Sequence, residues 1–295
     1  MDITVEPGTY VIAVSGGVDS VALLHYLQQV EDLNLTVAHF DHGIRDDSDE
    51  DRRLVQNMAN DYRLPFVFDV GNLGPAASEA KARKARYNFL QKVADTVEAD
   101  AIITAHHKDD VVETAIINLM RGTGRKGLTS LGNRSGIERP LTNVSKQSLV
   151  AYAKDQGLVW REDSTNSNQD YLRNYVRHNI TNGFDQNTQQ EFTGLINKQR
   201  RVNEELDKLL DEELQLHSRE GVVDRQWFIH LPHNVAKEIL ATWLRSNKVT
   251  SFDSKTLERL VVAAKVGQSG RNFDVISGTT LSVSHDGLAL NRFER

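Results

Sequence analysis

The sequence predicts an α/β fold in which a parallel twisted sheet carries helices on both faces. A smaller, mainly helical C-terminal domain with a short β-hairpin is expected to follow. Short apolar or β-branched runs alternate with stretches of helical spacing in the first half of the chain, which is typical of parallel strands joined by helices. Beyond about residue 189 the chain becomes rich in charges and poor in helix breakers, which indicates a separate helical part.

Four short runs of mostly apolar or β-branched side chains are predicted to form the sheet, namely residues 10–15, 35–40, 65–70 and 101–105. Between and after these strands, apolar residues recur at helical spacing. We therefore expect helices joined by right-handed crossovers, at residues 19–30, 48–62, 76–97, 109–120 and 145–156. A basic, glycine-rich loop is expected at residues 121–139.

The second domain is predicted to contain a long connecting helix, two shorter helices and a strand-rich tail, at residues 191–216, 227–245, 254–265 and 273–293. The tail alternates around Ser277-Gly278 and Asp286-Gly287, which indicates a hairpin. We place the boundary between residues 188 and 205, giving domains of residues 1–190 and 191–295.

Composition excludes several classes of protein. The chain of 295 residues is 39% hydrophobic and 26% charged, as in soluble globular proteins. No run approaches the roughly 18 apolar residues of a membrane span, and the N-terminus lacks a signal-peptide pattern, so we expect a cytoplasmic protein. The absence of cysteine excludes disulfides, thiolate metal sites and a cysteine nucleophile. A net charge of −6 argues against a nonspecific nucleic-acid coat.

The segment SGGVDS, Ser15–Ser20, follows the first predicted strand and precedes the first predicted helix. Glycines permit close backbone approach, and N–H groups at a helix start suit an anion. Asp19 could cap the helix or help to hold a metal ion. The alternative is a tight turn capped by Asp19, with no ligand. No lysine follows the glycines, so the sequence does not support a kinase or GTPase phosphate loop.

The segment HHKDDVVET, His106–Thr114, carries two acids three residues apart, Asp110 and Glu113. They are neighbours on one helix face and could hold Mg²⁺ or accept a proton from a nucleophile. Capping and solvation of a helix start is the alternative. Adjacent histidines are a weak metal signal, so structural roles are favoured for His106 and His107.

Basic residues gather at residues 79–92 and 121–139, and again in YLRNYVRH at residues 171–178. Arg173 and Arg177 are one helical turn apart, so both can reach one anion, and arginine suits phosphate or the edge of a base. Tyr171, Tyr175 and Trp160 could stack on an unpaired base, although core packing is favoured for Trp160. The alternative for the lysines is a solvated helix face.

Five segments in this order resemble the tRNA(Ile)-lysidine synthetase family of PP-loop ATP pyrophosphatases. They are SGGVDS, AHFDHGIRDDSDEDRRLVQ (38–56), EAKARKARYNFL (79–90), TAHHKDDVVETAIINLMRGTGRKGLTSL (104–131), and RPL (139–141) leading to WREDSTNSNQDYLRNYVRHNI (160–180). The resemblance covers about residues 10–180 and implies an adenine nucleotide α-hydrolase-like fold. The tail resembles short members that lack a second C-terminal domain.

The resemblance implies that ATP adenylates the C2 oxygen of the wobble cytidine in the CAU anticodon of tRNA(Ile). The ε-amine of L-lysine then attacks C2, which releases AMP and leaves lysidine. The implied catalytic residues are Asp19, Asp110 and Glu113, with Mg²⁺ near Asp19. The implied ATP-binding residues are Ser15, Gly16, Gly17, Val18, Asp19, Ser20 and His39. The implied tRNA-binding residues are Arg83, Arg86, Arg121, Arg173 and Arg177, with a contribution from residues 191–295.

Two other interpretations stay open. A different PP-loop ligase acting on a small acid or amide would consume ATP without RNA, and a catalytically idle RNA-binding protein would leave ATP intact. Sulfur-transfer members and amidotransferases commonly use cysteines, which this chain lacks. The oligomeric state is also open, and a homodimer is one candidate.

Overall fold

The computed structural model describes residues 3–43, 48–71, 79–132, 135–161, 172–249, 252–276 and 278–293. The chain divides into two compact units, Met1–Gln199 and Arg200–Arg295. The division falls within helix α8 (Gln186–Leu216), as does the boundary between residues 190 and 191 expected from the sequence. Among the helices of these residues, none is both long and apolar enough to cross a membrane.

The first unit contains a five-stranded sheet in the order β3-β2-β1-β4-β5, and all of its neighbouring strands are parallel. Its strands are β1 (Gly8–Ala13), β2 (Leu33–Asp41), β3 (Phe66–Val70), β4 (Ala101–Thr104) and β5 (Ile137–Glu138). The four predicted strands are confirmed. Strand order reverses between β1 and β4, and such a switch point is where ligands bind in open α/β sheets.

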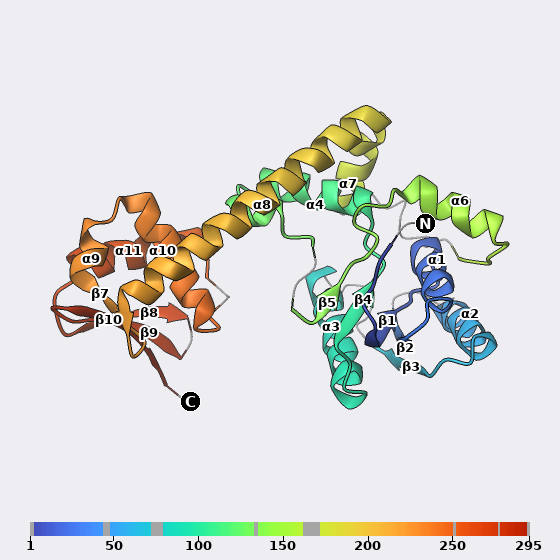
Figure 1. Cartoon of the computed structure of the whole chain (residues 1–295), viewed down its shortest axis with the longest axis horizontal. Helices are drawn as coiled ribbons and strands as arrows, with labels where there is room; N and C mark the ends of the chain where they lie inside the picture. Colours follow the sequence, from blue (N-terminus) through green and yellow to red (C-terminus); the bar gives the residue numbers. More distant parts are fainter. Residues whose placement is uncertain are drawn as a thin grey trace. The chain divides into compact units, whose positions relative to one another are not determined.

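Helices cover both faces of this sheet, as predicted (Figure 1). Side chains alternate along a strand, so Ile12 and Ile103 pack on the α1 side while Val11 and Ile102 pack against α3. The helices of this unit are α1 (Val18–Leu27), α2 (Ser48–Asp61), α3 (Glu79–Thr96), α4 (Lys108–Met120), α5 (Arg125–Leu128), α6 (Lys146–Asp155) and α7 (Leu172–Asn179), with a 3₁₀ turn at Thr181–Gly183.

The region predicted as a basic loop, residues 121–139, contains two short elements instead, α5 and β5. Gly122 takes a positive φ of 65° just after α4 ends, and Gly124 is the N-cap of α5. The prediction missed both because four helical residues and two strand residues are too few to show a period.

The second unit packs helices against an antiparallel sheet in the order β6-β7-β10-β9-β8. Its helices are α9 (Arg225–His230), α10 (His233–Ser246) and α11 (Ser254–Val266), and its strands are β6 (Ser218–Arg219), β7 (Val222–Asp224), β8 (Arg271–Ile276), β9 (Thr279–Val283) and β10 (Gly287–Arg292). The predicted single helix at residues 227–245 is wrong. Pro232 is the N-cap of α10, and a proline disrupts a continuous helix. The predicted hairpin is part of this larger sheet, whose core includes Phe228, Leu240 and Leu281.

Candidate active site

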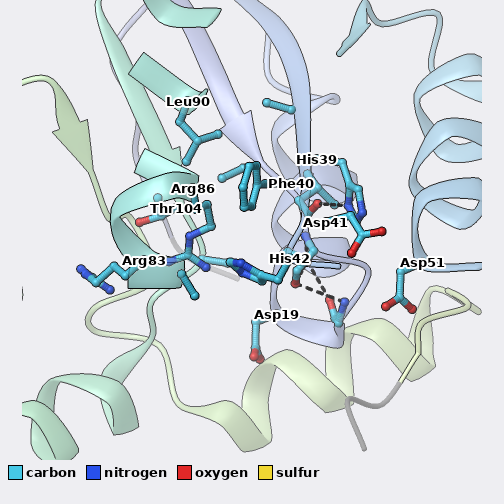
Figure 2. Close-up of a pocket in the computed structure, with 18 of the residues that line it drawn as sticks. Asp19, His39, Phe40, Asp41, His42, Asp51, Arg83, Arg86, Leu90 and Thr104 are labelled. Carbon is cyan, nitrogen blue, oxygen red and sulfur yellow. Dashed lines mark hydrogen bonds between the residues drawn. The ribbon is translucent and has the colours of Figure 1, made fainter. Parts of the chain in front are cut away.

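A cavity of about 470 Å³ lies at the carboxyl ends of β1, β2 and β4. Figure 2 shows Arg83 and Arg86 on one side of it, His39 and Asp41 on the other, and Asp19 apart from both groups. Among the predicted site residues, those that line the cavity are Ser15, Gly17, Asp19, Ser20, His39, Arg83, Arg86, Asp110 and Arg173.

The segment Ser15–Ser20 forms a tight turn from β1 into α1. Gly16 has a φ of 94°, a conformation that disfavours any side chain. Ser20 Oγ donates to Gly17 O at 2.9 Å and accepts from Ser15 N at 3.1 Å. Gly17 is the N-cap of α1 and no side chain caps this helix, so capping by Asp19 is wrong. The first N–H groups of α1 therefore lack a side-chain cap and suit an anion.

Asp19 pairs with a lysine that sequence reasoning missed. Lys146 Nζ lies 2.8 Å from Asp19 Oδ1 and 2.7 Å from Oδ2, and Lys146 is the first residue of α6. The phosphate-loop motif lacks a lysine, but the fold brings one from 127 residues away. No local sequence pattern indicates such a contact.

Arg161 also reaches the loop. Its backbone N–H donates to Gly16 O at 3.0 Å, and its Nε donates to Asp51 Oδ1 of α2 at 2.7 Å. Asp51 is buried and its Cβ lies beside Gly16. The loop is therefore supported from α2 and from the segment after α6, although neither residue was predicted to act here.

His107 and Asp109 connect the loop to α4. His107 is buried, with Nε2 at 3.7 Å from Asp19 and 3.5 Å from Asp110, and Nδ1 at 3.3 Å from Asp109. Burial lowers the pKa of His107, but the three aspartates raise it above its ordinary value. Burial raises the pKa of Asp109, but the nearby imidazole of His107 and a hydrogen bond from the Lys146 backbone N–H bring it well below its usual range.

Asp110 and Glu113 lie on one face of α4 and are both buried. Glu113 lies in the second turn of α4, which begins at Lys108. Arg177 of α7 donates to Glu113 Oε1 at 2.7 Å from Nε and to Oε2 at 3.0 Å from Nη2. Arg173 and Arg177 lie 4.0 and 3.7 Å from Asp110 Oδ1. The anion that these arginines share is thus this carboxylate pair.

The pKa values of the two carboxylates shift in opposite directions. Burial raises the pKa of Glu113, and Arg177 only partly opposes this. Burial also raises the pKa of Asp110, but His107 and other positive neighbours bring it below its ordinary value. The surroundings therefore favour the ionised form of Asp110 more strongly than that of Glu113.

Burial favours the neutral form of two histidines on the cavity wall. His39 Nδ1 bonds Val14 O at 2.9 Å, and burial lowers its pKa. His106 Nδ1 lies 2.8 Å from Thr104 Oγ1, and burial lowers its pKa to about 3. These contacts agree with structural roles.

Three arginines gather at α3 and β5, and we refer to Arg83, Arg86 and Arg139 as the arginine cluster. All three lower the pKa of Tyr87. Arg139 is 2% exposed and its Nη1 donates to Gly132 O. Arg121, in contrast, is exposed at the C-terminal end of α4, about 16 Å along the helix from Asp110, and it does not line the cavity.

Among the described residues, the others predicted for the site or for base stacking do not line the cavity. Gly16 and Val18 belong to the Ser15–Ser20 turn without lining the cavity, while Glu113 and Arg177 lie behind Asp110. Trp160 packs against the core of the first unit and Tyr175 is 46% exposed. Tyr171 lies outside the described residues.

Within the part of the chain that the structure describes, no three His, Cys, Asp or Glu side chains converge as metal ligands. Mg²⁺ in nucleotide sites usually takes one or two carboxylates together with substrate phosphates. Asp19 fits that requirement, because its carboxylate lines the cavity beside the turn and its side chain is 25% exposed.

Comparison with known protein families identifies the family to which this chain belongs. A profile of the PP-loop domain family matches residues 4–184, more than half of the chain. The chain belongs to the PP-loop domain family. The matched residues include the turn Ser15–Ser20, whose sequence SGGVDS is one of the motifs that carry the resemblance noted above.

Curated relatives of this PP-loop chain include proteins named tRNA(Ile)-lysidine synthase. The protein of Thermotoga maritima is 37% identical over 186 residues, covering 59% of this chain and 45% of the relative. The protein of Geobacter sulfurreducens is 39% identical over 182 residues, covering 58% and 39%. That of Actinobacillus pleuropneumoniae serotype 3 is 32% identical over 219 residues, covering 71% and 51%. The chain thus spans about half or less of the length of these relatives.

Among solved structures, the U34-tRNA thiolase NcsA from Methanococcus maripaludis superposes with a TM-score of 0.55 at 16% identity, covering 68% of this chain and 74% of that one. This likeness supports the PP-loop fold.

Proposed function

We propose that this chain catalyses ATP-dependent ligation of L-lysine to C2 of the wobble cytidine of tRNA(Ile), giving lysidine, AMP and pyrophosphate. The observation that carries this proposal is the pair Asp110 and Glu113, fixed by Arg173 and Arg177 beside the PP-loop. Asp110 and the Ser15–Ser20 turn line the same cavity, together with several arginines. In the proposed reaction Asp110 serves the ammonium nucleophile, and the turn binds the nucleotide phosphates. The names of the relatives support the same reaction.

In this proposal the PP-loop and the N-terminus of α1 bind the phosphates of ATP. Backbone N–H groups at a helix start receive phosphate well, and Lys146 adds a cation next to Asp19. Adenine would lie beside β2, where His39 and Phe40 line the cavity. Mg²⁺, held by Asp19 and the phosphates, would neutralise charge on the leaving pyrophosphate.

The two carboxylates have different parts in the lysine step. Asp110 lines the cavity and its surroundings favour its ionised form, so it is the group that contacts the ε-ammonium and takes its proton. Glu113 already accepts two hydrogen bonds from Arg177. It is therefore a positioning residue that fixes Arg177 close to Asp110.

The RNA enters from the arginine side of the cavity. A target base must leave its stack to reach an active site, and Arg83, Arg86 and Arg173 can contact its phosphates or edge. We propose that residues 1–190 act as the catalytic domain and that residues 191–295 contribute to tRNA binding, together with Arg121. We place the reaction in the cytoplasm and keep a homodimer as a candidate assembly, which light scattering would test.

The test is AMP release and transfer of labelled lysine to RNA. We expect AMP only when tRNA(Ile) with a CAU anticodon and lysine are both present, and methionine tRNA with the same anticodon serves as the control substrate. Asp110→Asn should lower kcat by about 100-fold or more, the usual contribution of a general base. The matched control, Asp155→Asn at the exposed end of α6, should retain activity.

Other outcomes would contradict the proposal. AMP formed without RNA would indicate a ligase for a small molecule, and tRNA binding with intact ATP would indicate an RNA-binding protein without catalysis.

A further inference from the structure

Tyr87 of α3 has no part in the reaction proposed above, yet it contacts two arginines of the cavity wall. The Cζ atoms of Arg83 and Arg86 lie 4.9 and 5.5 Å from the centre of its ring. Arg83 Nη2 is also 3.5 Å from the Tyr87 hydroxyl. One phenol therefore contacts two guanidinium groups, through its ring and through its oxygen.

The third member of the arginine cluster reaches the same hydroxyl. Burial raises the pKa of Tyr87, but Arg83, Arg86 and a hydrogen bond from Arg139 lower it below its ordinary value. Arg139 is almost fully buried, and its own position is fixed by the carbonyl of Gly132. The Tyr87 oxygen thus lies among three positive charges.

Carboxylates do not neutralise this part of the wall. Neither Arg83 nor Arg86 forms an ion pair with an acid in the described ranges, and the buried Nε of Arg86 has no hydrogen-bond partner there. His106, which lines the cavity nearby, stays neutral through burial and the three arginines. The wall therefore offers positive charge and N–H donors to a ligand.

Guanidinium groups repel one another at short range, so gathering them needs a group between them. A carboxylate would do so by cancelling their charge. A neutral phenol instead receives them on its ring face, by cation–π attraction, and on its oxygen, and each guanidinium keeps most of its five N–H donors. The guanidinium groups of Arg83 and Arg86 can therefore donate to an anion in the cavity.

We propose that Tyr87 is a positioning residue that holds Arg83 and Arg86 at the cavity wall, with Arg139 buried behind them, to receive a phosphodiester of the RNA strand. This inference rests on the proposed function, in which RNA is a substrate. Phosphate esters come from RNA and from ATP, but the proposed function assigns ATP to the Ser15–Ser20 turn, and Figure 2 shows Asp19 of that turn apart from Arg83 and Arg86. Arginine, with its planar fork, is suited to a backbone phosphate.

Two substitutions distinguish the contribution of the Tyr87 hydroxyl from that of its ring. Tyr87→Phe removes the hydroxyl and keeps the ring, while Tyr87→Leu removes both. The matched control is Tyr26→Phe on α1, whose hydroxyl lies 3.5 Å from Ile3 O and which does not line the cavity. For each variant we would measure the Kd for tRNA(Ile) at several salt concentrations, the Kd for a non-hydrolysable ATP analogue, and lysine transfer.

For Tyr87→Phe we expect tRNA affinity to fall about tenfold, as for removal of one hydrogen bond to a charged group. Tyr87→Leu should weaken binding by a further few-fold, because the cation–π interactions are removed as well. The slope of log Kd against log salt should fall by about 0.7 for each phosphate that the variant no longer binds. KM for tRNA should rise with kcat nearly unchanged, and affinity for the ATP analogue should match the wild type and Tyr26→Phe.

Equal loss of tRNA and ATP-analogue affinity would overturn the proposal, because it would indicate general damage to the fold. Loss of ATP-analogue affinity alone would assign the arginine cluster to the nucleotide, and unchanged affinities would leave Tyr87 with no positioning role. The proposed function is tested separately by the wild type. If it binds RNA through Tyr87 but transfers no lysine, the function fails and this inference stands.

Discussion

Arg177→Met would remove the partner of a carboxylate that has almost no contact with solvent. Glu113 is 1% exposed, and its two oxygens accept hydrogen bonds of 2.7 and 3.0 Å from Arg177. Removing one partner of a buried pair costs about 3–5 kcal/mol. The Arg177 side chain is 35% exposed, so solvent screens part of the attraction, and we expect the free energy of unfolding to fall by about 2–3 kcal/mol.

This destabilisation should depend on pH. Burial already raises the pKa of Glu113 despite Arg177, and without Arg177 that pKa rises further. A carboxyl whose pKa is higher in the folded than in the unfolded state destabilises the fold as pH rises between the two values. The deficit of Arg177→Met should therefore be smaller near pH 5 than near pH 8, because a lower pH favours the protonated, uncharged form of Glu113.

Urea unfolding at the two pH values would measure this deficit, and hydrogen exchange of the α4 peptide at residues 108–120 would locate it. The double variant Glu113→Gln/Arg177→Met should be more stable than Arg177→Met at pH 8, because a neutral amide costs less to bury than an unpaired charge. A deficit equal at both pH values, or a double variant no more stable than the single one, would refute the assigned ionic pairing.

Four further predictions concern other contacts. Gly16→Ala should weaken ATP-analogue binding and cost about 1–3 kcal/mol of stability, since φ is 94° there, as thermal unfolding would measure. Lys146→Met should raise the Kd for an ATP analogue about tenfold or more, the worth of a hydrogen bond to a charged group, whereas Lys154→Met at the other end of α6 should leave it unchanged in calorimetry. Because the pKa of His106 is about 3, NMR should show no titration of its ring between pH 5 and 8. Arg225→Met should destabilise the second unit, because this buried side chain donates to carbonyls including those of Ser284 and Gly267 at 2.7 Å; calorimetry should detect this while ATP-analogue binding to the first unit remains.

The sequence could predict those parts of the structure that have a local period or a local motif. The four longer strands and the helices between them follow from apolar spacing, and the turn at Ser15–Ser20 follows from its glycines and its place after a strand. Elements of two to four residues, such as β5 and α5, are too short to show a period. The break before α10 was readable from Pro232, and the prediction of one helix at residues 227–245 overlooked it.

Contacts between distant segments could not be predicted in this way. The spacing of Arg173 and Arg177 predicted that both can reach one anion, but it could not predict that they contact the side chains of Asp110 and Glu113 of α4. Lys146 and Arg161 reach Asp19 and Asp51 across 127 and 110 residues. Periodicity reports which face of a helix is apolar, whereas such ion pairs depend on how whole helices pack together.

The distance in sequence between Asp19 and Lys146 affects when the site becomes complete during synthesis. The PP-loop leaves the ribosome early, but the cation that pairs with Asp19 belongs to α6, which must dock beside α1. Contacts between segments so far apart form after local ones, because closing a long loop costs entropy before the contact stabilises it. A nascent chain that already contains SGGVDS would thus bind nucleotide weakly, and tight binding would mark completion of the first unit.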